Sequence, residues 1–307
     1  MPGRRTGAPG GSRFPVLLVA VAGVMAALAG LALGFRLFGV DQQHSDAVGR
    51  HRTDAAGSLS VATWNLCGVR RWNCEDTGSA EQKRTRIESL VRESGARVVL
   101  LQETCSEDLA TVRTSLGDEW RSLFRPYTAD REGDGTVTTR CTGDGRGTAG
   151  YGMLSAVPLS EVADVPLPQP ATGMRRSVLC AVARSEDVRI CTVHLNPQRS
   201  GAGSVPVELR AEQLRALVGA AGRRTVFGGD LNTGPPGPAG AGAWARVDGP
   251  YGVYRECDQS DTGGPGETHR GGYKIDYLFT DLPRQECSVL RSPASDHWAL
   301  LMRVTTG

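Results

Sequence analysis

The stretch Thr225-Val226-Phe227-Gly228-Gly229-Asp230-Leu231-Asn232 carries the clearest signal in the chain. Its apolar start predicts a strand, and because alternate side chains of a strand point to one face, Asp230 and Asn232 should project together. The two glycines leave room for another group to approach this point. An Asp-x-Asn sequence after a strand is also common turn chemistry. The stretch therefore indicates a functional site only if other apolar runs end in polar groups as well.

Several other apolar runs do end in polar side chains that suit catalysis or metal binding. An Asn after a strand is usually a turn former, a terminal carboxylate is often a solvated cap, and a single His is more often a structural hydrogen-bonding residue. Such a carboxylate becomes a metal ligand only if partners converge on it. The runs and the residues that close them are 59–64 with Asn65, 97–101 with Gln102 and Glu103, and 188–193 with His194.

Asp276 is a charged residue inside the apolar run 275–279. Burying a carboxylate is costly unless it is paired, so Asp276 should have a cationic or hydrogen-bonding partner. We expect this partner to be His297, because an Asp behind a His fixes the tautomer of the imidazole and stabilises its charged form.

Strand-like runs alternate with a few helices along the chain. The residues 79–82 resemble a capping box, and the apolar spacing after them predicts a helix that stops at Gly95. A second helix is predicted for 207–220, and this alternation favours layered α/β packing over an all-β sandwich. Polar or Pro-rich composition predicts connecting loops at 130–150, 164–174 and 233–250.

The first 40 residues differ from the remainder. Val16 to Gly34 is an uncharged apolar stretch of 19 residues, about 28 Å as a helix, which matches the hydrocarbon thickness of a bilayer. Arginines precede it without an acidic residue, so the positive-inside rule puts the N-terminus in the cytoplasm and the rest outside. Ala27-Leu28-Ala29 is a candidate signal-peptidase site. We expect a membrane anchor with an extracellular domain, or a secreted protein if this site is cleaved.

The chain is expected to divide into residues 1–40 as cytoplasmic N-terminus and anchor or signal segment, 41–57 as a flexible linker, and 58–307 as the folded domain. Four of the 35 basic residues and none of the 33 acidic ones lie in residues 1–40, which leaves a net charge of −2 for the rest. The outer domain is therefore not a basic nucleic-acid clamp. Lys83 and Lys274 are the only lysines, and this Arg-, Gly- and Ala-rich composition is typical of a GC-rich bacterial genome.

All eight cysteines follow the apolar segment, and an even count suits an oxidising compartment. Their spacing lacks the short pairs of a zinc site. Cys180 and Cys191 fall opposite each other if the chain turns at Ser185-Glu186, so they are the best candidate pair in a hairpin of 178–183 and 188–193. Sequence does not define the other pairings, and buried free thiols are the alternative.

Six short motifs in this order resemble the endonuclease/exonuclease/phosphatase family, which includes deoxyribonucleases, abasic-site endonucleases, neutral sphingomyelinases and inositol polyphosphate 5-phosphatases. The resemblance covers about residues 59 to 305 and makes 58–307 a catalytic domain. The motifs are Thr63-Trp64-Asn65, Leu101-Gln102-Glu103, Thr192-Val193-His194-Leu195, Gly229-Asp230-Leu231-Asn232, Ile275-Asp276-Tyr277 and Ser295-Asp296-His297.

This resemblance implies an α/β fold, a four-layer α/β/β/α sandwich of two packed mixed sheets flanked by helices, with the motifs gathered at one mouth. It implies a divalent cation, Mg²⁺ with Mn²⁺ as an alternative, held mainly by Glu103, with Asn65 and Asp296 close to the ion. The chemistry agrees, because a hard cation with oxygen ligands neutralises charge on a phosphate and supports the leaving oxygen.

Catalytic roles follow from the same resemblance. Asp230 would orient or deprotonate the attacking water, and Asn232 would hydrogen-bond a phosphate oxygen. His297, backed by Asp276, would assist at the nucleophile or the phosphate, and His194 would bind the phosphate from the other side.

Two substrate-binding candidates and two departures complete the site. The first departure is Thr268-His269, where many family members have Thr-Trp ahead of the Ile-Asp motif. Arg176 resembles an arginine that contacts substrate phosphate in deoxyribonucleases, with a solvated surface charge as the alternative. The Tyr151 hydroxyl would replace an Asn that supports the histidine of many family members. Cys105 stands where deoxyribonucleases carry an arginine that enters the DNA minor groove.

We therefore predict a Mg²⁺-dependent hydrolase of phosphodiester bonds that acts outside the cell, with nucleic acid as the leading substrate. It would contact the membrane through residues 16–34, and no protein partner is implied. A phospholipid or sugar-phosphate phosphoesterase is the alternative enzyme. A catalytically inactive binding protein is the alternative from another class, and the intact set of motif residues argues against it.

Overall fold

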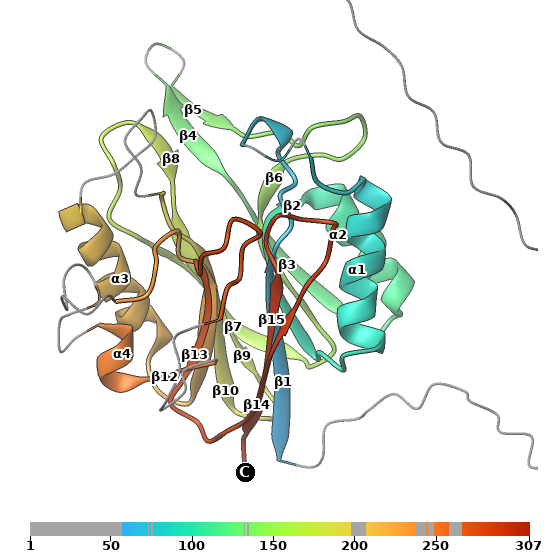
Figure 1. The fold of residues 1–307 in the computed structure, drawn as a ribbon, viewed down its shortest axis with the longest axis vertical. Coiled ribbons are helices and arrows are strands. Elements are labelled where there is room, and N and C mark those ends of the chain that lie inside the picture. The colour runs from blue at the N-terminus through green and yellow to red at the C-terminus, as the bar shows by residue number, and fades with distance from the viewer. Residues whose placement is uncertain are drawn as a thin grey trace, which may run out of the picture. The chain divides into compact units, whose positions relative to one another are not determined.

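Two six-stranded mixed sheets face each other in the computed structural model (Figure 1). The structure describes residues 57–72, 74, 76–131, 133, 135–197, 207–236, 244, 249–257 and 266–307. The first sheet contains, in order across it, β14 (Arg284–Leu290), β15 (Ala299–Thr305), β1 (Ser58–Asn65), β2 (Val98–Cys105), β6 (Ala149–Ser155) and β3 (Arg121–Pro126). The second contains β12 (Arg255–Glu256), β13 (Asp276–Thr280), β11 (Thr225–Asp230), β10 (Val188–His194), β9 (Ser177–Ala183) and β7 (Leu159–Pro166).

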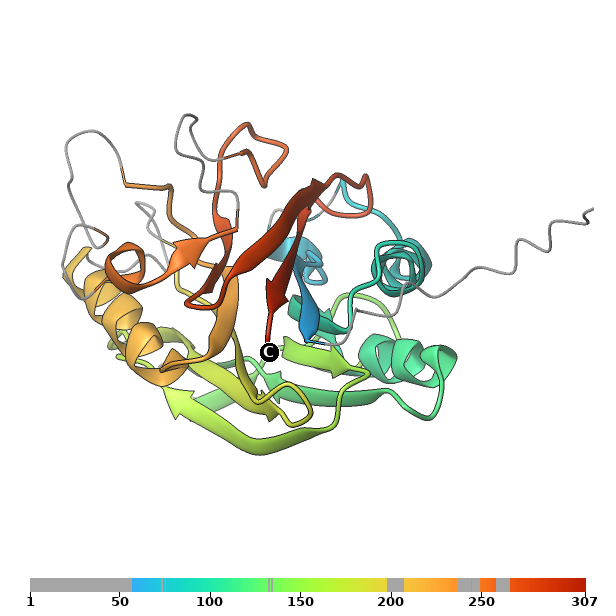
Figure 2. The same cartoon turned by 90° about the horizontal axis from the view of Figure 1, so that it is seen from below.

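Helices cover the outer face of each sheet (Figure 2). A third, three-stranded sheet lies beside them and has the order β5, β4, β8. Its strands are β5 (Gly135–Thr138), β4 (Thr128–Arg131) and β8 (Gly173–Arg175). The helices are α1 (Ala80–Arg92), α2 (Ser106–Leu116), α3 (Val207–Ala221), α4 (Pro250–Val253) and the 3₁₀ turn η1 (Arg70–Trp72).

Three hydrophobic clusters separate the four layers. The cluster between the sheets contains inward-facing residues of both, such as Leu100 of β2 and Ile190 of β10. A second cluster packs α1 and α2 on the first sheet, and a third packs α3 and α4 on the second sheet around Phe227. The central strands β1, β2 and β11 are buried along their whole length, so clusters of this kind cover both of their faces. The predicted four-layer α/β/β/α sandwich is confirmed.

Parallel strand pairs bring the motif residues to one end of the sandwich. β1 runs parallel to β2 with Asn65 opposite Gln102, and β10 runs parallel to β11 with His194 opposite Asp230. Since parallel strands finish at the same edge of a sheet, the polar residues that close these runs must lie together. The sandwich therefore builds its mouth from strand ends of both sheets.

Gly228 and Gly229 serve the sheet itself and not an incoming ligand. A Cβ on Gly228 would lie 1.9 Å from the carbonyl oxygen of Tyr277, and one on Gly229 would lie 2.0 Å from that of Val193. Gly229 also has a φ of +133°, which suits a residue without a Cβ. The glycines do leave room for a close approach, as predicted, and the groups that approach are the backbones of the neighbouring strands.

The capping box and hairpin predictions are confirmed. Ser79 accepts a hydrogen bond from the backbone of Gln82, whose side chain accepts one from the backbone of Ser79. The sequence prediction missed α2, and it assigned loops to 130–150 and 164–174 where the structure has β4, β5, β7 and β8. These strands are short, edge-located or only partly buried, so their apolar pattern is weak.

The predicted anchor at 16–34 and all of the linker 41–57 except Gly57 lie outside the described residues. Among the residues that the structure does describe, no helix is long and apolar enough to span a bilayer.

All eight cysteines form disulfides. Cys180 of β9 lies directly opposite Cys191 of β10, and the two are bonded, as predicted. The pairs that sequence left open are Cys67–Cys74, Cys105–Cys141 and Cys257–Cys287. Buried free thiols, the alternative, are therefore not found.

Candidate active site

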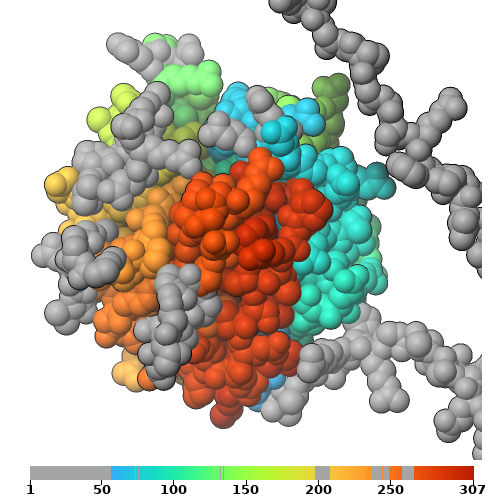
Figure 3. Space-filling view, in the orientation of Figure 1, coloured from blue at the N-terminus to red at the C-terminus, as the bar shows by residue number. Residues whose placement is uncertain are grey.

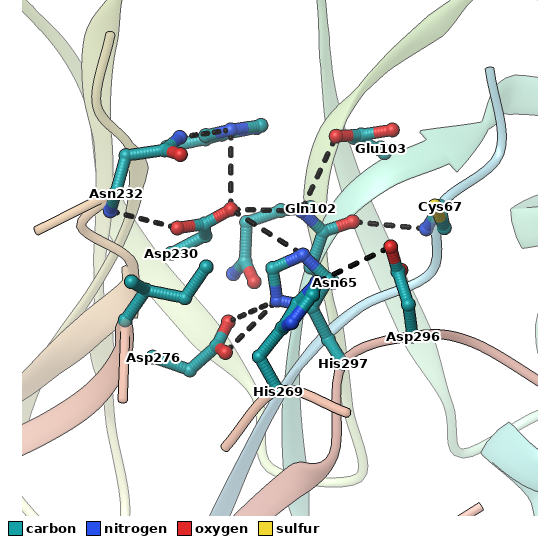
Figure 4. Close-up of polar contacts among 12 residues, drawn as sticks. Asn65, Cys67, Gln102, Glu103, Asp230, Asn232, His269, Asp276, Asp296 and His297 are labelled. Carbon is teal, nitrogen blue, oxygen red and sulfur yellow. Dashed lines mark hydrogen bonds and ion pairs between the residues drawn. The ribbon is translucent and has the colours of Figure 1, made fainter. Parts of the chain in front are cut away.

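Segments from both sheets and from the C-terminal part of the chain meet at the mouth of the sandwich. In the space-filling view the residues from 266 onward cover the face between the two helical layers (Figure 3). In the close-up, the polar side chains of Asn65, Glu103, Asp230, Asp276 and His297 point toward one another (Figure 4). Most of them are less than one-tenth exposed.

Asn65, Glu103 and Asp230 form the centre of this cluster. The Asn65 side-chain amide lies 2.9 Å from Asp230 Oδ2 and 3.3 Å from Glu103 Oε1, and donates a hydrogen bond to each. Asn65 and Glu103 come from the first sheet, whereas Asp230 comes from the second. Glu103 has a φ of +49° at an irregularity in the pairing of β2 with β6, so the bulge redirects its side chain toward the mouth.

His297 and Asp276 form a buried pair beside this centre. His297 Nδ1 lies 2.9 and 3.1 Å from the two carboxylate oxygens of Asp276 and donates to them. His297 Nε2 points toward Asp230 Oδ2 at 3.9 Å. The Trp64 indole donates to the His297 carbonyl at 3.0 Å, which fixes the loop that carries the imidazole. The predicted Asp276–His297 pair is therefore present in the structure.

His194 lies on the other side of Asp230. Its Nε2 is 3.3 Å from Asp230 Oδ2 and 2.9 Å from the Asn232 side-chain amide. Its Nδ1 is 2.7 Å from the hydroxyl of Tyr127, which also accepts the backbone N–H of Glu103 at 3.1 Å. Tyr127 thus links this histidine to the strand that carries Glu103.

The expected role of Tyr151 as the support of His194 is wrong. The Tyr151 hydroxyl bonds to Ser177, and the ring packs on that of Tyr127 with centroids 5.6 Å apart. Tyr127 takes the supporting role because it directly precedes β4, next to the bulge of β2. No local sequence signal marked Tyr127 for this position, since its partners are 24 and 67 residues away.

Asp296 has a partner that sequence reasoning did not assign. His269 Nε2 lies 3.3 Å from Asp296 Oδ2, while His269 Nδ1 accepts the backbone N–H of Gly271 at 2.9 Å. The Gly271 contact places the proton of the neutral imidazole on Nε2, so His269 donates to Asp296. The only signal was the departure Thr268-His269 ahead of the Ile-Asp motif. Thr268 Oγ1 accepts the backbone N–H of Asp276 at 3.0 Å, which holds this segment against β13.

Burial governs the charge of the two central carboxyl groups. It raises the pKa of Glu103 to about 7, although the charge of His297 and the Asn65 amide act in the other direction. Burial also raises the pKa of Asp230 above its ordinary value. Without a cation, either group ionises less readily than it would in water, because negative charge in a dry site is costly. A carboxyl group with a pKa near neutrality is suited to accept a proton from water.

The two histidines of the motifs differ in charge. Burial opposes protonation of His297, but the carboxylates of Asp276, Asp230 and Asp296 outweigh it and raise the pKa to about 10. Burial lowers the pKa of His194 well below its ordinary value, and the positive charges of Arg176 and His297 lower it further. His297 is therefore an imidazolium and His194 a neutral imidazole near pH 7.

Arg176 is buried, with 5% of its surface exposed, and lies next to Tyr127. Its guanidinium carbon is 4.8 Å from the centroid of the Tyr127 ring, a cation–π contact. Arg176 and Tyr151 line one pocket beside the motif cluster and not the cluster itself. The alternative reading of Arg176 as a solvated surface charge does not fit this burial.

A disulfide-closed loop lies against the centre. The backbone N–H of Cys67 donates to Asn65 Oδ1 at 2.9 Å, and Cys74 Sγ lies 3.6 Å from Glu103 Oε2. Buried Lys83 holds the same loop, because its Nζ donates to the carbonyl of Leu66 at 2.6 Å and to that of Ala294 at 2.7 Å. The ammonium group of Lys83 therefore ties the loop that follows Asn65 to the loop that precedes Asp296.

The donor set fits a hard divalent cation. The carboxylates of Glu103 and Asp230 converge on the Asn65 side-chain amide, whose nitrogen faces them while its oxygen accepts the Cys67 N–H. The site is buried, and the described residues offer Glu103 no basic hydrogen-bond partner. Oxygen ligands of this kind suit Mg²⁺ or Mn²⁺, and an ion would offset the cost of ionising Glu103. Glu103 therefore suits the main ligand that the resemblance implies. Asp296, which the resemblance also places close to the ion, is linked to the Asn65 backbone through Ser295 Oγ, which donates to the Asn65 carbonyl at 2.8 Å and lies 3.4 Å from Asp296 Oδ1.

A four-layer sandwich that gathers oxygen ligands, an Asp–His pair and a second histidine at one mouth defines a metal-dependent phosphoesterase. The sequence agrees, because the family model described as "Endonuclease/Exonuclease/phosphatase family" matches residues 62–297. The chain belongs to this family. A comparison with curated protein sequences gave no significant match.

Solved structures of the family share this fold. D. rerio TDP2 in complex with a single-strand DNA product is 15% identical, with a TM-score of 0.57 over 81% of this chain and 99% of that one. The human Nocturnin catalytic domain is 15% identical, with a TM-score of 0.58 over 83% and 97%. The 3'-5' exonuclease NExo of Neisseria meningitidis is 16% identical, with a TM-score of 0.55 over 80% and 100%. At these identities the likeness concerns the fold.

Proposed function

We propose that this protein is a Mg²⁺-dependent hydrolase of phosphodiester bonds that acts on nucleic acid outside the cell. The observation that carries the proposal is the buried convergence of Asn65, Glu103 and Asp230 from two sheets, flanked by one charged and one neutral histidine. An inactive binding protein would have no use for this complete set of groups, so we favour an enzyme.

The proposed ion is held by Glu103, with Asn65 and Asp296 close to it, and Mn²⁺ is the alternative to Mg²⁺. When bound, the cation neutralises charge on the phosphate and stabilises the departing oxygen. Asp296 is kept ionised for this role, because although burial opposes ionisation, its hydrogen bond from His269 and the charge of His297 lower its pKa.

The remaining groups would orient and move protons. Asp230 Oδ2 receives the proton of the attacking water, a role that its raised pKa suits. The Asn232 amide hydrogen-bonds a phosphate oxygen. His297, held by Asp276, presents Nε2–H toward the phosphate, and neutral His194 binds the phosphate from the other side without adding a positive charge.

Nucleic acid is supported as the substrate by two structural neighbours, D. rerio TDP2 in complex with a single-strand DNA product and the 3'-5' exonuclease NExo, and by the phosphate-binding residues proposed for the site. Two observations favour the alternative, a phospholipid or sugar-phosphate substrate. Cys105 is bonded to Cys141, so this position offers no arginine to a DNA groove. The balance of charge outside residues 1–40, a net −2, is also not that of a nucleic-acid clamp.

Location outside the cell is supported by the four disulfides, which persist in oxidising compartments. We keep the division proposed from sequence: residues 1–40 as the anchor or signal segment, 41–57 as linker and 58–307 as the catalytic domain, which begins at β1.

The test is hydrolysis by the full chain, purified without reductant in mild detergent, with Mg²⁺ or EDTA. Plasmid DNA, RNA, sphingomyelin and bis(4-nitrophenyl) phosphate are the substrates. We expect chelator-sensitive cleavage of nucleic acid, and Glu103→Gln should lower it about 10²–10³-fold, the loss typical of one preorganised electrostatic group. Glu212→Gln, an exposed position on α3, is the matched control. Turnover of sphingomyelin alone would select the phospholipase alternative, and silence on all four substrates would refute the proposal.

A further inference from the structure

A buried arginine of α3 lies behind the end of β11. Arg210, near the start of α3, has 0% of its surface exposed, as does Leu214 one turn further along the helix. Arg210 is outside the six motifs, whereas β11 carries Asp230 as its last residue. Burying a cation is costly unless hydrogen bonds or an opposite charge compensate it. The contacts of Arg210 therefore indicate what its charge does.

Arg210 contacts the backbone between two residues of the candidate active site. Its Nη1 donates a hydrogen bond to the carbonyl of Leu231, the residue that separates Asp230 from Asn232. A guanidinium donor makes this bond charge-assisted, and such bonds are stronger than those between neutral groups. The arginine thus holds the backbone at the point where Asp230 and Asn232 enter the mouth.

The peptide group between Leu231 and Asn232 is held at both of its ends. Its carbonyl accepts from Arg210, and its N–H donates to Asp230 Oδ1 at 2.8 Å (Figure 4). Because a peptide group is planar, the direction of its carbonyl fixes the direction of its N–H. With Oδ1 engaged in this way, Asp230 Oδ2 is directed to the Asn65 amide at 2.9 Å. The guanidinium therefore acts on the Asp230 carboxylate through one peptide group.

The same peptide group needs a restraint, because Asn232 has a φ of +51°. Residues other than glycine occupy this left-handed region only at an energetic cost. A flip of the Leu231–Asn232 peptide would bring φ of Asn232 back to a negative value. The flip would also turn the N–H away from Asp230 and the carbonyl away from Arg210. The bond from Arg210 opposes this flip.

Arg210 also brings a positive charge close to Asp230. Burial lowers the pKa of Arg210 to about 10, and the charge of Asp230 acts in the other direction. The guanidinium is therefore a cation near pH 7. In a dry environment its charge polarises the peptide group, which strengthens the hydrogen bond from the Asn232 N–H to Asp230.

We propose that Arg210 is a positioning residue, which keeps the Leu231–Asn232 peptide in the orientation in which its N–H holds Asp230 ready for the attacking water. The inference rests on the proposed function. Arg210 acts through Asp230 and does not touch the substrate. Its loss should therefore lower kcat and leave KM nearly unchanged, since substrate binding does not depend on it.

The first test compares Arg210→Met with Leu214→Ala in the full chain, by hydrolysis of bis(4-nitrophenyl) phosphate with Mg²⁺. Leu214 is the matched control, because it is equally buried on the same helix and packs in the hydrophobic cluster under α3. Arg210→Met should lower kcat about 10- to 100-fold, equivalent to about 1.4–2.7 kcal/mol of activation free energy. Leu214→Ala should lower the midpoint of guanidinium unfolding and keep kcat.

A conservative variant adds a rescue to this comparison. Arg210→Lys should recover most of the lost kcat, because an ammonium group is also a charged donor for the Leu231 carbonyl. If Arg210→Met does not fold, Arg210→Gln takes its place, since its neutral amide removes the charge and keeps a polar group.

The second test observes the peptide group directly and needs no turnover. In EDTA, the NMR signal of the Asn232 amide proton should lie downfield in the wild type, because this N–H donates to a carboxylate. The neutral variant of Arg210 should move the signal upfield, whereas Leu214→Ala should leave it in place. An unmoved signal in the Arg210 variant would overturn the inference.

The kinetic outcomes separate this inference from the proposed function. Wild-type kcat in the neutral variant of Arg210 would overturn the inference and leave the hydrolase intact. Equal losses of kcat in the Arg210 and Leu214 variants would show that Arg210 only stabilises the fold, which also overturns it. If the wild-type chain cleaves none of the four substrates named above, the proposed function itself fails, and the catalytic role of Arg210 fails with it.

Discussion

Removal of the Cys67–Cys74 disulfide should impair catalysis, whereas removal of the Cys180–Cys191 disulfide should cost a similar amount of stability without impairing catalysis. The perturbation is the double variant Cys67→Ala/Cys74→Ala, compared with Cys180→Ala/Cys191→Ala. The bridges close loops with sequence separations of 7 and 11, for which chain entropy predicts losses of about 2.5 and about 3 kcal/mol. Both variants should thus melt about 5–10 °C below the wild type, by the usual relation for a domain of this size.

Their effects on activity should differ because only one bridge lies at the mouth. The Cys67 backbone orients the Asn65 amide, and Cys74 packs against the Glu103 carboxylate. Loss of one such oriented hydrogen bond is worth about 1–1.5 kcal/mol, or about tenfold in kcat/KM. The Cys180–Cys191 bridge joins β9 and β10 away from these groups, so its variant should keep wild-type turnover below its melting temperature.

Guanidinium denaturation measures the stability of both variants, and Mg²⁺-dependent hydrolysis of bis(4-nitrophenyl) phosphate at 20 °C measures activity. We expect matched midpoints, with a raised Mg²⁺ requirement and lower turnover only for the Cys67/Cys74 variant. Equal activity in the two variants, whether both retained or both lost, would refute the reasoning that the loop positions the metal ligands.

Three other predictions concern the same mouth. Asp276→Asn removes a carboxylate that holds the pKa of His297 at about 10. NMR titration should show this pKa falling by at least one unit, and turnover should fall about 10²-fold or more. An unchanged titration would exclude Asp276 as the cause of the raised pKa of His297. The pKa of Glu103 is raised to about 7, and Mg²⁺ binding needs the ionised carboxylate, so Mg²⁺ affinity should rise with pH through about 7. Binding below pH 7 should release a proton, which calorimetry in buffers of different ionisation enthalpy would show. A flat affinity from pH 5.5 to 8.5 would contradict this prediction. Tyr127→Phe leaves the Glu103 N–H unpaired, so it should cost about 1–3 kcal/mol of stability and about tenfold in turnover. Tyr254→Phe is the control, because it loses a comparable hydrogen bond to a carbonyl remote from the mouth and should lower stability alone.

The centre of the site could be predicted because its residues close strands. Polar residues at the ends of apolar runs are visible in one sequence, and parallel pairing of β1 with β2 and of β10 with β11 brings those ends together. Asp276 was predicted to need a partner from the cost of burying a charge alone, and the structure places His297 there. The Cys180–Cys191 bridge followed from hairpin register in the same way.

The support of the site could not be predicted because it depends on contacts between distant segments. Tyr127 lies at the junction of β3 and β4, and only the three-dimensional arrangement puts its hydroxyl between Glu103 and His194. The hairpin of β4 and β5 has mostly exposed residues, so its sequence resembles a loop. His269 was visible as a departure from the family pattern, but its contact with Asp296 depends on the turn at Gly271.

The burial of both lysines gives the protein an unusual chemical property. Lys83 and Lys274 are 4% and 3% exposed, the first held by carbonyl groups and the second paired with Glu256 at 2.8 Å. The folded chain thus offers amine-directed reagents no exposed ε-amino group. Biotinylation of Lys83 can proceed only when the loops around the mouth open, and that of Lys274 only when the edge near β12 opens. Mass spectrometry of the two biotinylated peptides over time would therefore report local opening at two separate places without any substitution in the chain.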